Sequence, residues 1–177
     1  MIVVVPLSGG AHRVDEYLQA TRLAVSTASI DIDVDLTAGT EVAPRVWALI
    51  DTDRNGRISE AEGRTYADAL LRSMTLRLDG RPYPVVLVAS RFPTREDMAG
   101  GSGPIHVQAR AAIPAMRAGR HRLFFRNAHE LSMSVYLVNA LVPIEPGITI
   151  AAQRRDPRQT QATITYDVGP RPGSRRS

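Results

Sequence analysis

Residues 51–62, with the sequence DTDRNGRISEAE, carry oxygen-bearing side chains at a spacing that suits a hard divalent cation. Asp51, Asp53 and Asn55 offer carboxylate or amide oxygens at the first, third and fifth positions of this stretch, and Glu62 offers a carboxylate at the twelfth. Calcium takes about six to eight oxygen ligands, so a loop that wraps around the ion can supply most of them. The stretch therefore predicts a calcium site.

Two further positions complete the predicted ligand set. Arg57 would contribute its backbone carbonyl, and Ser59 would bind the ion directly or through a water. Gly56 permits the positive φ that bends the chain back, and Ile58 is expected to anchor the loop to the core. The predicted metal ligands are Asp51, Asp53, Asn55, Arg57, Ser59 and Glu62.

The stretch matches the whole pattern D-x-[DN]-x-[DN]-G-x₅-E, and it resembles an EF-hand loop. The flanking residues agree with this resemblance. Val42, Val46, Leu49 and Ile50 fall at helical spacing before the loop, and Tyr66, Leu70 and Met74 do so after it. We therefore expect a helix-loop-helix over about residues 40–74. Gly63 departs from the pattern, since glycine weakens the start of the exiting helix.

The alternative interpretation is a degenerate loop or a polar turn that binds no metal. EF-hands usually occur in pairs, and the sequence contains no second loop of this kind. Arg54 and Arg57 also offset part of the negative charge of the ligands. We therefore expect weak binding, with a Kd of roughly 10⁻⁵ to 10⁻³ M, which suits a structural site in extracellular calcium.

The length and composition are typical of a single domain without disulfides. The chain has 177 residues and no cysteine, and its 22 basic residues are all arginine. The net charge of +4 lies in residues 154–177, which carry six arginines and two aspartates, so residues 1–153 are neutral. A nucleic-acid partner is therefore not expected. Residues 169–177, rich in Pro, Gly and Arg, are predicted to form a disordered basic tail.

The first residues resemble the end of a secretory signal peptide. MIVVVPLSGGAH is an apolar run followed by small residues, with a cleavage point expected near Gly10 or Ala11. We therefore predict that residues 1–11 are a signal-peptide remnant and that the protein is bacterial and periplasmic or secreted. The alternative is that these residues form a first strand. No other segment approaches the roughly 18 apolar residues of a membrane-spanning helix.

Outside the helix-loop-helix, the sequence alternates between apolar and polar residues, which is typical of strands. Residues 29–36 alternate strictly, and a Gly80 turn after Asp79 predicts a hairpin between residues 74–78 and 83–92. Eight or nine short strands are expected. The predicted fold is mainly β with an α insertion: an antiparallel, Ig-like β-sandwich over residues 12–168 that carries the EF-hand between its second and third strands.

Other residues in these elements receive ordinary structural interpretations. Asp31, Asp33 and Asp35 lie on one face of a strand, where successive side chains are about 7 Å apart, too far to share one ion. They predict a solvated acidic face that discourages pairing at a sheet edge. Trp47, on the entering helix, is expected to pack on a sheet and fix the EF-hand to it.

The sequence contains no motif that predicts catalysis, and we expect the protein not to be an enzyme. A nucleophile elbow, a phosphate-binding loop and an H-E-x-x-H motif are all missing. His121 and His129 could approach one another across a hairpin, but polar-face histidines are commoner. If cleavage follows Ala11, His12 becomes the first residue and could chelate nickel or copper. A transition-metal-binding accessory protein is therefore the alternative function.

The stretches AHRVDEYLQATRL, DLTAGTEVAP and ALIDTDRNGRISEAE are similar to a group of bacterial exported proteins with an EF-hand-like loop in a β-rich domain. They also distantly resemble extracytoplasmic domains of nickel/cobalt permease-type proteins. The chain contains no permease helices, so a transport role of its own is not expected. The resemblance implies an exported, calcium-binding accessory or binding module, with a membrane protein as a candidate partner.

Overall fold

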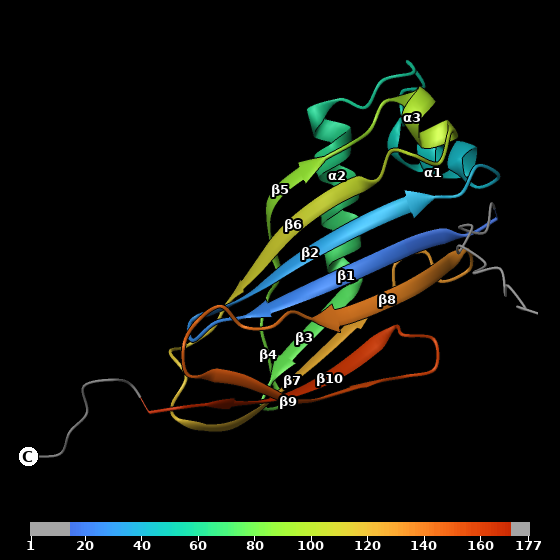
Figure 1. Cartoon of the computed structure of the whole chain (residues 1–177). Helices are drawn as coiled ribbons and strands as arrows, with labels where there is room; N and C mark the ends of the chain where they lie inside the picture. Colours follow the sequence, from blue (N-terminus) through green and yellow to red (C-terminus); the bar gives the residue numbers. More distant parts are fainter. Residues whose placement is uncertain (1–14, 171–177) are drawn as a thin grey trace, which may run out of the picture.

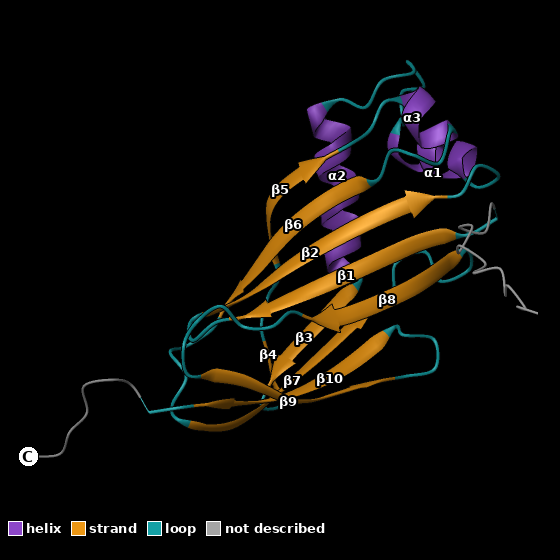
Figure 2. Ribbon diagram, viewed as in Figure 1, coloured by secondary structure: helices purple, strands orange, loops and turns teal. Residues whose placement is uncertain are grey.

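A computed structural model describes residues 15–170, which form two five-stranded sheets and three helices (Figures 1 and 2). The predictions for residues 1–11, for His12 and for residues 171–177 of the tail lie outside the described residues. The strands are β1 (Tyr17–Val25), β2 (Ser29–Ala38), β3 (Met74–Leu78), β4 (Arg81–Pro82), β5 (Val86–Arg91), β6 (Ile105–Ala112), β7 (Gly119–Asn127), β8 (Ser134–Ala140), β9 (Ile148–Arg155) and β10 (Gln161–Val168). The helices are α1 (Ala43–Ile50), α2 (Glu60–Arg72) and α3 (Arg95–Ala99).

The two sheets confirm that the fold is mainly β with a helical insertion. The first sheet has the order β5-β6-β2-β1-β8, and the second, called sheet B below, has the order β4-β3-β7-β10-β9. All strand pairs are antiparallel except β1 and β8, which are parallel. The prediction of a wholly antiparallel fold is therefore wrong at this pair, because β8 follows a crossover from sheet B and joins β1 in the same direction.

Strand β2 forms where the alternating pattern predicted a strand, but the prediction that its aspartates discourage pairing at a sheet edge is wrong. Its apolar residues are buried and its aspartates face outward, as predicted. However, β2 lies between β1 and β6 in the centre of its sheet, so its aspartates protect no edge. Instead, Asp35 pairs with Arg22 and His106 on the two neighbouring strands, and Asp31 pairs with Arg110.

The Asp79–Gly80 turn forms as predicted, but the strand after it is much shorter than expected. Both turn residues have positive φ, of 50° and 82°, as a two-residue hairpin turn requires. Only the two residues of β4 pair with β3. The chain then crosses to the other sheet, where β5 pairs with β6. The following loop also contains a short helix, α3, which the sequence did not predict.

Side chains of β9 join the two sheets where their edges meet. The Gln153 amide donates to the Ala140 carbonyl and accepts from its N–H, and the Arg155 guanidinium donates to the Val138 carbonyl. These side chains satisfy backbone groups at the outer edge of β8, which a further strand would otherwise satisfy. The buried apolar residues of both sheets and of α1 and α2 form one continuous core.

The helical insertion lies between β2 and β3, as predicted, and its apolar face belongs to that core. Val46 and Ile50 of α1 are buried, whereas Leu49 is largely exposed. Tyr66 and Leu70 of α2 are buried too, but Met74 begins β3 and is not part of the exiting helix. Among the described helices, none has the length and apolar character needed to cross a membrane.

Candidate metal centre

The loop between α1 and α2 brings three of the predicted ligands together. A carboxylate oxygen from each of Asp51, Asp53 and Glu62 lies within 4.8 Å of the others. Asp51 follows the last residue of α1, and Glu62 lies in the first turn of α2, so the two helices set the width of the cluster. Asp51 is buried, Glu62 is half-buried and Asp53 is exposed.

Asp51 is held firmly in place. One of its oxygens accepts hydrogen bonds from the Trp47 indole at 2.9 Å and from the Gly56 N–H at 2.9 Å, and the other accepts from the Asn55 N–H at 3.1 Å. Burial alone would raise the pKa of this carboxyl. The Trp47 indole and the backbone N–H groups outweigh burial, so the pKa of Asp51 lies below its ordinary value and the side chain is ionised at neutral pH.

Glu62 has two structural tasks in addition to its place in the cluster. It forms a capping box with Ser59: Ser59 donates its N–H and its hydroxyl to Oε2, and the Ser59 oxygen accepts from the Glu62 N–H. The other oxygen, Oε1, accepts from the N–H and hydroxyl of Thr52. The Ser59 donors and then those of the loop lower the pKa of Glu62 to about 2.

The remaining predicted ligands contact this cluster through hydrogen bonds. The Asn55 side chain donates to Asp53 at 2.8 Å and accepts from the Arg57 N–H at 2.8 Å. Arg57 is otherwise exposed. Ser59 is both the N-cap of α2 and a donor to Glu62. The loop therefore arranges Asp51, Asp53 and Glu62 directly, with Asn55 and Ser59 beside them.

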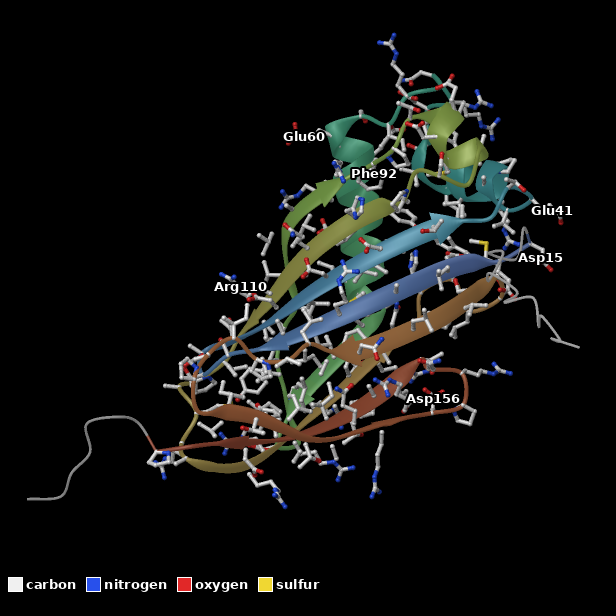
Figure 3. All side chains as sticks on the ribbon, viewed as in Figure 1. Asp15, Glu41, Glu60, Phe92, Arg110 and Asp156 are labelled. Carbon is white, nitrogen blue, oxygen red and sulfur yellow. The ribbon has the colours of Figure 1, made fainter. Side chains whose placement is uncertain are left out.

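The structure explains why glycine occupies two positions in this region. Gly56 has a φ of 80°, the left-handed conformation expected for the sixth position of the loop. Gly63 looked like a weak point of α2, but a Cβ there would lie 2.7 Å from Cε2 of Phe92. The Phe92 ring, labelled in Figure 3, therefore packs directly on the α2 backbone. It also makes an edge-on contact with Tyr66.

The donor set fits a hard cation. Every side-chain atom that converges is an oxygen, and the three carboxylates bring three negative charges into a small space. Soft or nitrogen ligands are absent from this cluster, which disfavours copper or zinc over calcium. Chemically, three carboxylates in this arrangement are able to coordinate a hard cation between the two helices.

A buried polar network next to the loop was not predicted. The Tyr66 hydroxyl, one turn after Glu62, lies 2.7 Å from the Tyr17 hydroxyl and 3.0 Å from Nε2 of His129. Gln19 donates to the His129 carbonyl and accepts from the Asn127 amide. These partners are up to 110 residues apart in sequence, so no local pattern points to them. A pocket of about 410 Å³ is lined in part by Glu62 of the loop and by Tyr66 and His129 of the network.

The histidines do not form a metal cluster in the part of the chain that the structure describes. His121 bonds to Asp79 and to the Arg117 carbonyl, whereas His129 bonds to Tyr66. His121 is half-buried on β7, whereas His129 is buried in the turn after β7, so the prediction of a polar-face strand histidine is wrong for His129.

The chain matches no protein-family model, and neither the curated proteins nor the solved structures contain a significant match.

Proposed function

We propose that this protein is a calcium-binding accessory or binding module in which residues 51–62 hold one structural calcium ion. The observation that carries the proposal is the convergence of the Asp51, Asp53 and Glu62 carboxylates within 4.8 Å in a loop with the full EF-hand spacing. Asn55, Ser59 and the Arg57 carbonyl would complete the ligand set. The module is proposed to be non-enzymatic and exported, on an Ig-like β-sandwich scaffold.

The bound ion would act by joining α1 to α2. Asp51 ends α1 and Glu62 lies in the first turn of α2, so a shared cation fixes the distance between these two helix ends. It also compensates the mutual repulsion of three carboxylates, which otherwise opposes the closed loop. Because Trp47 and Tyr66 tie the same helices into the core, ordering the loop stabilises the whole insertion.

We expect millimolar calcium to raise the melting temperature of the full chain above its value in excess chelator. At a hundredfold excess over Kd, the stabilisation is about 2.7 kcal/mol, or roughly 5–10 °C for a chain of this size. Glu62→Gln removes a charged ligand and leaves one oxygen to accept the Ser59 bonds of the capping box, at the loss of the bonds from Thr52. The variant should therefore fold well and lose the response to calcium.

Glu60→Gln is the matched control, because it removes the same charge from the same helix turn at an exposed position. This variant should retain the rise. An equal rise in wild type and Glu62→Gln, or no rise in wild type, would contradict the proposal. A response to nickel or copper alone would favour the alternative site at His12.

A further inference from the structure

The outer face of sheet B is strongly basic. Strand β7 alternates so that Arg120, Arg122, Phe124 and Arg126 point away from the core, because Leu123, Phe125 and Asn127 between and beside them are buried. The register across the sheet places Arg77 opposite Phe124, Phe124 opposite Thr163 and Thr163 opposite Arg154. Facing residues of antiparallel strands share a face. Five arginines thus share this face with one aromatic ring.

Most of this charge has no counter-charge. Arg120 pairs with Asp167 through two hydrogen bonds of 2.9 and 3.0 Å. Within residues 15–170, no ion pair or side-chain hydrogen bond involves the guanidinium groups of the other four arginines, and all four are exposed. Although residues 1–153 carry equal numbers of basic and acidic residues, the opposite charges are therefore unevenly distributed over the molecule. The loop of residues 51–62 is at the far end of the helical insertion from sheet B (Figure 1), and the free arginines are on β3, β7 and β9 of sheet B.

The shape of this face favours a broad anionic surface over a small ligand. The five best-formed pockets of residues 15–170 lie elsewhere, since none of them is lined by these arginines or by Phe124. Single-stranded nucleic acid is bound in grooves by several stacking aromatic rings, whereas this face has the single half-buried ring of Phe124.

The neighbouring loop also favours a lipid surface. Residues 141–147 lead into β9 at one end of sheet B, where the Gly169 N–H donates to the Gly147 carbonyl. In this loop Val142 is 87% exposed and Ile144 is 98% exposed. Exposed apolar side chains beside basic residues suit the interface of an anionic bilayer.

We propose that the outer face of sheet B docks on the surface of an anionic phospholipid bilayer. The unpaired guanidinium groups of Arg77, Arg122, Arg126 and Arg154 contact the lipid phosphates, which arginine can bind through two hydrogen bonds at once. This proposal does not depend on calcium, because the face is built wholly from sheet B.

The test is sedimentation of the full chain with vesicles, in chelator so that the metal loop plays no part. Vesicles of phosphatidylcholine containing about one third phosphatidylglycerol should bind the chain at low salt, and pure phosphatidylcholine should not. About 0.5 M sodium chloride should release it. Arg122→Gln/Arg126→Gln should weaken the partition coefficient roughly 30-fold, given the usual contribution of each basic residue near an anionic membrane.

Arg45→Gln/Arg72→Gln is the matched control, because it removes two exposed arginines from the helices and should change binding less than twofold. Equal weakening by both double variants would overturn the proposal, since it would show attraction by net charge alone. Failure to bind anionic vesicles would also overturn it. Binding to single-stranded DNA but not to vesicles would replace the bilayer with a nucleic-acid partner.

Discussion

Replacing Trp47 with alanine should lower the free energy of unfolding by about 3–5 kcal/mol, the usual cost of deleting a large buried aromatic side chain. Trp47 is the only tryptophan and is 7% exposed, and its ring lies in the common core of the sheets and helices. Its indole N–H also donates to Asp51 at 2.9 Å. The substitution therefore removes apolar contacts and leaves a carboxylate without one of its donors.

Urea unfolding in chelator measures this cost without any contribution from calcium. Leu49→Ala on the same helix is the control, because Leu49 is 41% exposed and its truncation should cost much less than that of the buried Trp47. Trp47→Phe separates the loss of apolar packing from the loss of the indole N–H, because phenylalanine keeps most of the packing but has no N–H. Its cost in free energy of unfolding should lie between those of Leu49→Ala and Trp47→Ala. A cost below about 1 kcal/mol for Trp47→Ala would show that α1 is not fixed to the core by this residue.

The second large effect is a loss of stability in mild acid that depends on His129. This side chain is 7% exposed, and burial lowers its pKa from 6.5 to about 4. Between these two values the unfolded chain binds a proton that the folded chain does not, so stability falls as the pH falls from 6.5 towards 4. The expected loss between pH 7 and pH 5 is about 2 kcal/mol.

The comparison of wild type with His129→Gln isolates this contribution, because glutamine can still bond to Tyr66 but does not titrate. The variant should show a smaller loss of stability between pH 7 and pH 5. His121→Gln should show a larger loss of stability than wild type between pH 7 and pH 5. Burial opposes protonation of His121, but Asp79 and the Arg117 carbonyl raise its pKa above 6.5, so its contribution is present in acid and disappears at higher pH. Identical pH profiles for all three chains would contradict this account.

The local patterns of the sequence predicted much of this fold, and most of the failures concern long-range pairing. Alternation identified β2, and the Asp79–Gly80 pair identified a turn, because both depend on neighbouring residues. The amino-acid sequence of β8 does not indicate that this strand runs parallel to β1, which lies more than 100 residues earlier in the chain. Similarly, Asp35 looked solvated because its partner His106 comes from a strand 71 residues away.

In the candidate site, too, local features could be predicted from the sequence and long-range contacts could not. The loop spacing placed Asp51, Asp53 and Glu62 in one cluster, since a twelve-residue stretch closes on itself through local geometry. The reason for Gly63 was not visible, because Phe92 reaches it from the β5–α3 loop. The bond from Trp47 to Asp51 spans one helical turn, and an i, i+4 search could have found it.

That bond provides the most direct test of the calcium site. The emission of Trp47, excited selectively, should change during a calcium titration because its indole N–H is bonded to a predicted ligand. We expect a saturable change with a midpoint of roughly 10⁻⁵ to 10⁻³ M. It should be absent in Glu62→Gln and retained in Glu60→Gln. No change in wild-type emission up to about 10 mM calcium, well above the weakest expected Kd, would contradict the claim that residues 51–62 bind calcium.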